Sequence, residues 1–300
     1  MFRAPKLTKP GLFITATDTG VGKTVATCAI AWQLRQQGLS RVGVCKPMAS
    51  GCRRDREGLV SEDAEAIAHF ADCRQPLNII NPIRYARPLA PAVAADQAQE
   101  PPDFDALTRS LELLDATQEC VLIEGVGGLL VPLHPKKPQW TVLDLIALLG
   151  YPVVVVCRAG LGTLNHTAMT VRLLREAGCT VAGLIINGYV PDPGEAMATA
   201  VKQSAQREAN QSDKETGAVA APVKASSADT LQADPRDDSM TTNRIWLQKM
   251  NHAPILATIP VCPATSVAPE KGRLPDAILD AVGLTYWPDV LRSPLPLGEG

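Results

Sequence analysis

The sequence Gly11-Leu-Phe-Ile-Thr15 runs directly into Ala16-Thr-Asp-Thr-Gly-Val-Gly-Lys-Thr24, and this junction decides the fold. Five residues typical of a buried strand precede a glycine loop that ends Gly-Lys-Thr, and a largely apolar helical stretch follows. In such a junction the N–H groups of the loop and of the helix N-terminus point at phosphate oxygens. We expect Lys23 to reach the outer phosphates and the Thr24 hydroxyl to bind Mg²⁺. The junction therefore predicts a nucleoside triphosphate site.

The loop departs from the usual phosphate-loop pattern at its first glycine, because Thr17 stands in that position. The alternative is an ordinary strand, turn and helix in which Lys23 is a surface residue. The apolar strand before the loop and the apolar helix after it favour the phosphate loop over that alternative.

The composition bounds the class of protein. The chain has 300 residues and is 46% hydrophobic, so it can bury a substantial core, and we expect one domain over residues 1–300. A net charge of −2 with dispersed basic residues predicts no nucleic-acid partner. The longest apolar run, residues 152–157, is far below the roughly 20 residues that span a bilayer, so no membrane partner is expected. The N-terminal residues lack the apolar core of a leader, which favours a cytoplasmic location.

Cysteine and histidine usage argues against a metal or disulfide framework. No Cys-x-x-Cys pair occurs among the eight cysteines, which predicts buried free thiols in a reducing compartment. The cysteines that lie within apolar segments are Cys28, Cys45, Cys120, Cys157 and Cys179. The four histidines are isolated from one another, so we expect no histidine metal cluster.

Short β-branched runs alternate with longer helical patterns along the chain. The predicted strands cover residues 12–15, 42–45, 120–123, 153–157, 181–186 and 255–259. The predicted helices cover residues 22–37, 61–71, 104–116, 141–149, 163–177 and 241–250. This alternation predicts an α/β fold, a mostly parallel sheet with helices on both faces, of the P-loop NTPase type. Ligands bind such sheets beyond the carboxyl ends of the strands.

One stretch does not fit this alternation. Residues 199–239 are rich in small, polar and charged types, and no aromatic residue occurs between Tyr189 and Trp246. Such a segment buries too little apolar surface to offset its ordering entropy, so we predict a flexible insertion. Residues 195–208 are compatible with a helix, and residues 293–300 are predicted to be a disordered tail.

Polar residues follow the second and third strands. Lys46 leaves the second strand and is placed near transferred phosphate or an anionic substrate, although a solvated lysine before Pro47 fits equally well. Glu124 ends the third strand and begins Glu124-Gly-Val-Gly-Gly128, where a carboxylate commonly holds Mg²⁺. The alternative for Glu124 is an incidental acid in a glycine turn. Asp63 is a further candidate ligand, but an acid in a first helical turn also favours the helix dipole.

Two more strands end in candidate ligand-binding loops. Ala159-Gly-Leu-Gly-Thr163 opens a helix whose free N–H groups suit a carboxylate or phosphate, although Thr163 is also a plausible plain N-cap. Asn187 ends the fifth strand and offers a donor and an acceptor to an adenine edge. Asn187-Gly188 is equally typical of a turn.

Taken together, these segments resemble the dethiobiotin synthetase family. The resemblance spans residues 11–190 and resumes over residues 241–287, with the motifs in the family's order and at roughly its spacings. The segments that carry it are Thr17-Asp-Thr-Gly-Val-Gly-Lys-Thr24, Lys46-Pro-Met-Ala-Ser-Gly51, Glu124-Gly-Val-Gly-Gly128, Leu161-Gly-Thr-Leu-Asn-His166 and Ile186-Asn-Gly188. One such motif is weak support, whereas five in register are specific.

The resemblance implies a cyclo-ligase that converts 7,8-diaminononanoate, CO₂ and ATP to dethiobiotin, ADP and phosphate, with Mg²⁺ and as a homodimer. It implies that Lys46 is catalytic and that Thr24, Asp63 and Glu124 arrange the metal. The residues it assigns to ATP are Gly20, Val21, Gly22, Lys23, Thr24, Val25, Asp63, Glu124, Gly125, Val126, Gly127, Asn187, Gly188, Pro260, Val261 and Cys262. The residues it assigns to the substrate are Thr19 and Ser50 at the reacting end, and Thr163, Leu164 and Asn165 at the far carboxylate, across the dimer interface.

Three other functions are compatible with a phosphate loop in this kind of fold. A cobyrinate-type amide synthase needs a glutamine-hydrolysing domain, and the roughly 100 residues after Asn187 leave no room for one. A partitioning ATPase uses a lysine early in the loop, where this chain has Asp18. Other ligases that activate an amine or an acid remain as alternatives, and diamine-dependent phosphate release separates the synthetase from a switch ATPase.

Overall fold

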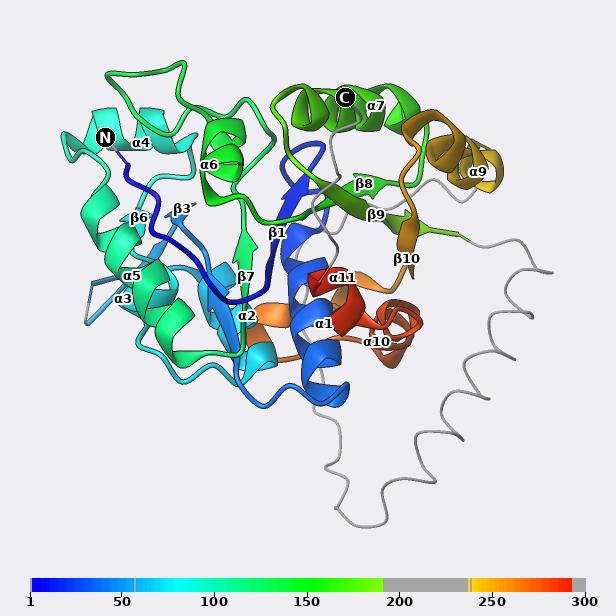
Figure 1. The fold of residues 1–300 in the computed structure, drawn as a ribbon, viewed down its shortest axis with the longest axis horizontal. Coiled ribbons are helices and arrows are strands. Elements are labelled where there is room, and N and C mark those ends of the chain that lie inside the picture. Colours follow the sequence, from blue (N-terminus) through cyan, green and yellow to red (C-terminus); the bar gives the residue numbers. More distant parts are fainter. Residues whose placement is uncertain (1, 57, 191–236, 238, 293–300) are drawn as a thin grey trace, which may run out of the picture.

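A computed structural model describes residues 2–56, 58–190, 237 and 239–292 of the chain. Within these residues the central element is a six-stranded sheet with the order β10-β9-β8-β1-β7-β2, in which all neighbouring strands are parallel (Figure 1). Its strands are β1 (Gly11–Ala16), β2 (Val42–Cys45), β7 (Cys120–Glu124), β8 (Val153–Arg158), β9 (Val181–Tyr189) and β10 (Ile255–Pro260). The predicted fold class, an α/β fold with a mostly parallel sheet, is confirmed.

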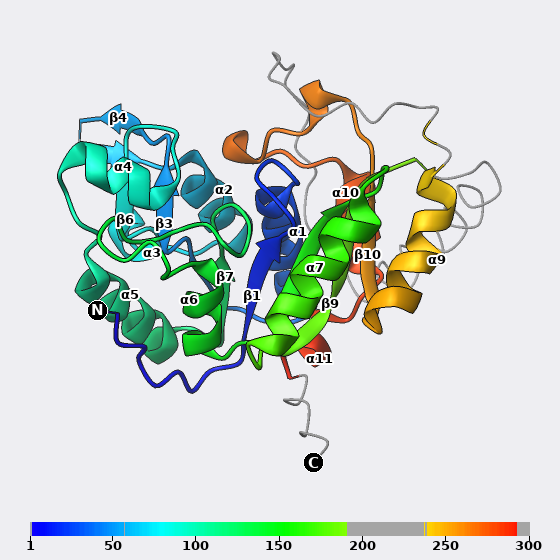
Figure 2. The ribbon, with the colours of Figure 1, turned by 90° about the horizontal axis from the view of Figure 1, so that it is seen from above.

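Helices cover both faces of this sheet (Figure 2). Those packed against one face are α5 (Phe104–Thr117), α6 (Val142–Leu149), α7 (Thr163–Glu176) and α9 (Ser239–Asn251). Those packed against the other are α1 (Lys23–Gln36), α2 (Glu62–Ala71), α10 (Asp276–Gly283) and α11 (Trp287–Leu291). The described residues also contain the short helices α3 (Leu77–Ile80) and α4 (Pro91–Ala98), with 3₁₀ turns at Ala264–Ser266 and Pro269–Lys271.

Strand β1 shows why the strands of this sheet are apolar throughout. Phe13 belongs to the core cluster on the α5–α7 side, whereas Leu12 and Ile14 belong to the cluster on the α1 side. All three side chains are completely buried. A parallel sheet covered on both faces needs apolar residues at successive positions, which explains continuous runs such as Val153-Val-Val-Val-Cys157.

The chain reverses direction across the sheet at β1. From β1 it passes through α1 to the outer strand β2, and β7 later returns to lie between them, while β8 lies on the other side of β1. The loop after β1 therefore opens at the switch point of the strand order. Ligands of doubly wound sheets bind at such a point, beyond the carboxyl ends of the strands.

All six predicted strands and all six predicted helices are confirmed; most ends agree to within one residue, and two differ by more. Strand β9 continues to Tyr189, so Asn187-Gly188 lies within a strand rather than in a separate turn, although Gly188 has φ 76° at an irregularity in the pairing with β10. Helix α9 begins at Ser239 rather than at residue 241. Apart from Asp237 and Ser239, the predicted insertion over 199–239 lies outside the described residues, as do residues 195–208 and 293–300.

Four three-residue strands were not predicted from the sequence. Strands β3 (Met48–Ser50) and β6 (Ile83–Tyr85) form a parallel pair, and β4 (Arg53–Asp55) and β5 (Gly58–Val60) form an antiparallel pair. Three residues are too few to reveal a period of two in the sequence. Strands β3, β4 and β5 carry the chain from β2 to α2, and β6 follows α3.

The cysteines are free thiols, as predicted. Five are buried, namely Cys28, Cys45, Cys52, Cys120 and Cys157. The expectation of burial is wrong for Cys179, which is partly exposed because it follows the C-terminal end of α7. Among the described residues, no helix combines the length and the apolar character that crossing a bilayer requires.

Candidate active site

The loop between β1 and α1 is shaped by two glycines in left-handed backbone. Gly20 has φ 69° and Gly22 has φ 99°, and Gly22 is the N-cap of α1. Residues with a Cβ rarely adopt this conformation, so both glycines are needed for the turn. The helix starts at Lys23 with no side-chain cap, which leaves its first N–H groups directed into the loop.

Lys23 reaches across the mouth of this loop. Its Nζ donates to the backbone oxygen of Asp18 at 3.1 Å and to that of Gly127 at 2.9 Å. Burial, together with the nearby charge of Lys46, lowers the pKa of Lys23 to about 8. A phosphate anion in the loop would offset both effects, because an opposite charge favours the protonated ammonium.

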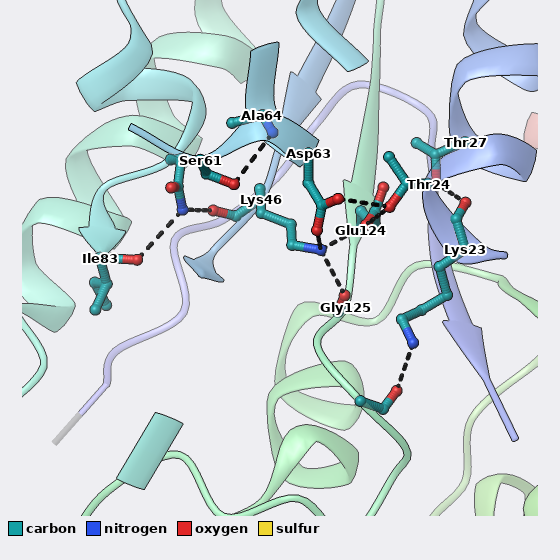
Figure 3. A network of polar contacts seen from close by, with 12 residues as sticks. Lys23, Thr24, Thr27, Lys46, Ser61, Asp63, Ala64, Ile83, Glu124 and Gly125 are labelled. Atoms are coloured by element: carbon teal, nitrogen blue, oxygen red, sulfur yellow. Dashed lines mark hydrogen bonds and ion pairs between the residues drawn. The ribbon is translucent and has the colours of Figure 1, made fainter. Parts of the chain in front are cut away.

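Three side chains from different elements meet at the foot of the loop (Figure 3). The Thr24 hydroxyl lies 3.0 Å from Oδ1 of Asp63 and 2.9 Å from Oε1 of Glu124. Thr24 stands in the first turn of α1, Asp63 in the first turn of α2, and Glu124 at the end of β7. The N-cap of α2 is Ser61, whose Oγ accepts from the Ala64 N–H, so capping does not occupy the Asp63 carboxylate.

Lys46 extends from the end of β2 to the same two carboxylates. Its Nζ lies 2.8 Å from Oδ2 of Asp63, 2.5 Å from Oε1 of Glu124 and 3.4 Å from the Gly125 carbonyl. Lys46 is 3% exposed, so the alternative of a solvated surface lysine is wrong. Its carbonyl accepts from Nδ2 of the buried Asn81 at 2.6 Å. Sequence reasoning missed Asn81, because no motif surrounds it.

The pKa values of these groups follow from burial and from the ion pairs. The Lys46 ammonium holds the pKa of Asp63 below its ordinary range. Burial lowers the pKa of Lys46, but the Glu124 and Asp63 carboxylates outweigh burial and raise it overall. Burial raises the pKa of Glu124 against the opposing effect of Lys46. Lys46 is therefore a permanently charged group at neutral pH.

The donor set suits a hard divalent cation. It consists of one hydroxyl and two carboxylates, and oxygen atoms are the ligands that Mg²⁺ takes. Within the described part of the chain, Oε2 of Glu124 is buried and accepts no hydrogen bond. A buried carboxylate oxygen without a partner is energetically unfavourable, and a cation bound beside Oε2 of Glu124 would supply the missing interaction. The residues present therefore fit Mg²⁺.

These groups line a cleft of about 340 Å³. The predicted site residues on its wall are Thr19, Gly20, Gly22, Lys23, Thr24, Val25, Lys46, Ser50, Asp63, Glu124, Val126 and Gly127, and Ala49 completes the lining. The structure thus brings the phosphate loop, the lysine after β2 and the acid after β7 into one cavity. Val21 and Gly125 contribute backbone oxygens next to it.

The residues assigned to the adenine end lie at the neighbouring ends of β9 and β10. Asn187 is paired with Ile259, and the Val261 N–H donates to the Tyr189 carbonyl at 3.0 Å, which brings Gly188 near the stretch Pro260-Val-Cys262. Nδ2 of Asn187 donates to the Val21 carbonyl at 2.8 Å. Asn187 therefore braces the phosphate loop.

The three residues assigned to the far carboxylate lie apart from the cleft, at the start of α7. Gly162 is the N-cap with φ 88°, and Thr163 is the first helical residue. The alternative of Thr163 as an N-cap is therefore wrong; its buried hydroxyl lies 3.3 Å from that of Thr167. Leu164 is half-buried, and Asn165 is exposed on the first turn.

Comparisons with known proteins place this site in a family. A family model of an AAA domain matches residues 10–268. The chain is 44% identical over 182 residues to the ATP-dependent dethiobiotin synthetase BioD of Anaeromyxobacter sp. (strain K), covering 61% of this chain and 78% of that relative. It is 39% identical over 187 residues to the enzyme of the same name from Thermodesulfovibrio yellowstonii, with the same two coverages. Among solved structures, the MinC:MinD cell division protein complex of Aquifex aeolicus matches with TM-score 0.48 and 10% identity, over 96% of this chain and 98% of that chain.

Proposed function

The chain belongs to the family of ATP-dependent dethiobiotin synthetases, and we propose that it forms dethiobiotin from 7,8-diaminononanoate, CO₂ and ATP, with release of ADP and phosphate. The observation that carries this proposal is the position of Lys46 between the Asp63 and Glu124 carboxylates, at the foot of the phosphate loop. A cation, a metal-binding oxygen set and a phosphate cradle in one cleft are the parts that such an ATP-dependent ring closure needs.

The proposed reaction proceeds in three steps. One amine of the substrate adds to CO₂ and loses a proton to give a carbamate. A carbamate oxygen then attacks the γ-phosphorus of ATP, the bond to ADP breaks, and a mixed anhydride forms. The second amine attacks the carbonyl carbon of that anhydride, phosphate leaves, and the ureido ring closes.

The lysines of the cleft serve the charged stages of this sequence. An alkylammonium has a pKa near ~10, and the attacking amine must be neutral. Positive charges on Lys23 and Lys46 would lower the pKa of a substrate amine held beside them. The same charges would stabilise the carbamate and the phosphoryl group in transfer. Lys46 is therefore proposed as the catalytic residue.

Mg²⁺ is proposed to be held by Thr24, Asp63 and Glu124. When bound, it would neutralise charge on the β- and γ-phosphate oxygens of ATP. The phosphate loop from Gly20 to Val25 would hold the same oxygens through its N–H groups. We assign no general base, because substrate and phosphate groups can accept the protons. Orientation of the reactants is proposed to supply most of the rate enhancement, for which roughly 7–11 kcal/mol is available.

Separate groups of residues are proposed to contact the adenine of ATP and the two ends of the diamine. Asn187, Gly188 and the backbone at Pro260-Val-Cys262 would contact adenine. Thr19 and Ser50 on the cleft wall would contact the reacting end of the diamine. The start of α7 from Thr163 to Asn165 would bind the far carboxylate of a substrate whose amines lie in the partner subunit of a homodimer. We also propose that residues 1–300 form one domain.

The first experiment incubates the purified protein with Mg-ATP, labelled bicarbonate and 7,8-diaminononanoate and measures acid-stable label. Incorporation that requires both ATP and the diamine would establish ureido-ring formation. If ATP binds and no label is fixed, the substrate assignment is wrong and the phosphate loop stands. Phosphate release that ignores the diamine would instead favour a switch ATPase.

A further inference from the structure

The loop between β8 and α7 is fastened to α9 by a buried asparagine. Nδ2 of Asn243 donates to the Ala159 carbonyl at 2.8 Å and lies 3.3 Å from the Gly160 carbonyl. Asn243 is 5% exposed and belongs to the second turn of α9. Figures 1 and 2 both show α9 lying alongside α7. A residue far along the chain thus holds two successive carbonyls of this loop.

Asp237 holds the next N–H group of the same loop. Its Oδ2 accepts from the Leu161 N–H at 2.8 Å, and its Oδ1 accepts from the Ser239 N–H at 3.0 Å and from the Ser239 hydroxyl at 2.5 Å. The Ser239 hydroxyl in turn accepts from Nδ2 of Asn243 at 3.1 Å. The hydrogen bonds therefore form a closed ring that joins the Ala159 carbonyl to the Leu161 N–H through three side chains.

Gly160 allows this close approach. A Cβ at Gly160 would lie 2.7 Å from Oδ2 of Asp237, which is closer than a carbon and an oxygen can approach without a shift. The loop continues through Gly162, the N-cap of α7, into Thr163. Any displacement of residues 159–161 therefore displaces the first turn of α7, because only Gly162 separates them.

We propose that Asn243 is a positioning residue for the carboxylate end of the diamine substrate, acting through the loop from Ala159 to Gly162. The inference rests on the proposed function, which assigns the substrate carboxylate to the first turn of α7. Its physical basis is that Asn243 and Asp237 fix successive backbone groups immediately before that turn. Removing the Asn243 amide would free those groups and move the N–H groups that receive the carboxylate.

A second asparagine on α9 provides a matched control. Asn251 is 2% exposed, and its Nδ2 donates to the Leu247 carbonyl within α9 at 2.8 Å. Its loss removes the same chemical group from the same helix without touching residues 159–162. If Asn243 only stabilised α9, Asn243→Ala and Asn251→Ala should therefore change the kinetic constants to a similar extent.

The test measures steady-state kinetics of Asn243→Ala, Asn243→Asp and Asn251→Ala with 7,8-diaminononanoate and ATP. For Asn243→Ala we expect the KM for the diamine to rise about tenfold, the size expected for one lost buried hydrogen bond. The kcat and the KM for ATP should stay within about twofold, because only the KM for the diamine depends on the contact between its carboxylate and the first turn of α7. Asn243→Asp keeps the size of the side chain but has no N–H to donate, so it should behave like Asn243→Ala. Asn251→Ala should leave all three constants near the wild-type values.

A substrate without the carboxylate separates positioning from a general defect. With 2,3-diaminooctane, the vicinal diamine that lacks this group, wild type and both Asn243 variants should give the same kcat/KM. Equal impairment with both diamines, or an equal effect of Asn251→Ala, would overturn the inference while leaving the proposed function intact. If the wild-type protein fixes no labelled bicarbonate with either diamine, the proposed function itself has failed.

Discussion

The ammonium of Lys46 and the carboxylate of Glu124 form an ion pair in which Nζ lies 2.5 Å from Oε1. The side chain of Lys46 is 4% exposed and that of Glu124 is completely buried. Burying either charge alone would carry a large desolvation cost, which the attraction between the two opposite charges offsets when both are present. The pair therefore links the strand end after β2 to that of β7 and fixes the geometry of the cleft between them.

Glu124→Gln should destabilise the protein because it leaves the Lys46 charge with the half-exposed Asp63 as its remaining carboxylate partner. We expect a loss of about 3 kcal/mol in the free energy of unfolding, and a partial recovery in Lys46→Met/Glu124→Gln. Urea unfolding of both single variants and the double variant gives the coupling energy. The exposed pair Arg172 and Glu176 is the control, and its coupling is expected to be much smaller because water screens the two charges. A Lys46–Glu124 coupling no larger than that of the control would contradict this account.

Lys46→Ala should abolish turnover while ATP binding falls only modestly, because Lys46 lies outside the phosphate loop and is proposed to act beside the reacting groups. A folded variant that keeps more than about a tenth of the wild-type kcat would rule out a catalytic role, since a tenfold change is only ~1.4 kcal/mol. Lys46→Met, which fills more of the vacated space, separates loss of the charge from loss of packing. Near-ultraviolet circular dichroism establishes that each variant is folded.

Lys23→Ala should remove most of the affinity for ATP. The Lys23 ammonium is held over the loop by the Asp18 and Gly127 carbonyls, so it is in place before phosphate arrives. A hydrogen bond between charged groups contributes about 1.5–3 kcal/mol, and we expect Kd to rise about a hundredfold. Isothermal titration with a non-hydrolysable ATP analogue measures it. Lys249→Ala, at an exposed position of α9, should bind ATP like wild type. Unchanged binding in Lys23→Ala would exclude the phosphate-loop role.

Much of this site was predictable because parallel strands bring their carboxyl ends to one edge. Lys46 and Glu124 each follow an apolar strand, and the sheet order places β2 and β7 side by side. The sequence alone was compatible with either a surface lysine or a site residue at Lys46, and with either a helix-dipole acid or a metal ligand at Asp63. Only the three-dimensional contacts distinguish these alternatives. The Asp63 carboxylate faces Lys46 and Thr24, whereas Ser61 caps the helix.

Other parts of the site have no local signal in the sequence. Asn81 holds the Lys46 carbonyl from the C-terminal end of α3. Asn243 holds the Ala159 carbonyl from α9, 84 residues further along the chain. Such contacts depend on how distant segments pack, and an isolated asparagine in a helix carries no pattern. The strands β3 to β6 were missed because three residues show no periodicity.

The two left-handed glycines of the phosphate loop should respond differently to alanine. A Cβ at Gly22 would lie 2.1 Å from Nδ2 of Asn187, whereas a Cβ at Gly20 meets nothing within 4 Å. Gly20→Ala should therefore cost only the backbone strain, about 1–2 kcal/mol. Gly22→Ala adds a clash and displaces Asn187 from the Val21 carbonyl, so ATP binding should be lost. Thermal unfolding and ATP titration measure both effects.

A double variant tests the contact between Gly22 and Asn187 directly. Gly22→Ala/Asn187→Ala removes the clash but keeps the strained backbone, so its thermal stability should exceed that of Gly22→Ala and approach that of Gly20→Ala. Asn187→Ala alone gives the reference change in thermal stability. If Asn187→Ala lowers the stability of Gly22→Ala by the same amount, the two residues act independently, and the contact of Asn187 with the loop is not supported.

Asp115 should make the stability of the fold sensitive to acid. Its carboxylate, on α5, accepts from the Thr8 N–H at 2.8 Å, the Thr8 hydroxyl at 2.7 Å and the Lys9 N–H at 2.8 Å, which fastens the chain just before β1. Burial raises the pKa of Asp115, but these three hydrogen bonds outweigh burial and hold it below its ordinary range.

The pKa of Asp115 is lower in the folded protein than in the unfolded chain, where it is about 4. The contribution of Asp115 to the free energy of unfolding is therefore complete above the unfolded pKa and is lost as the pH falls through the folded pKa. Asp115→Asn should lower the free energy of unfolding by about 1–3 kcal/mol at pH 7, because the amide accepts fewer of the three hydrogen bonds. The difference from wild type should shrink below about pH 4, where the protonated Asp115 resembles asparagine. Urea unfolding from pH 7 to pH 3 measures it, with the exposed Glu112→Gln on the same helix as control. A difference that stays constant over this range would show that the charge of Asp115 does not contribute, because only ionisation of that carboxyl couples the contact to pH.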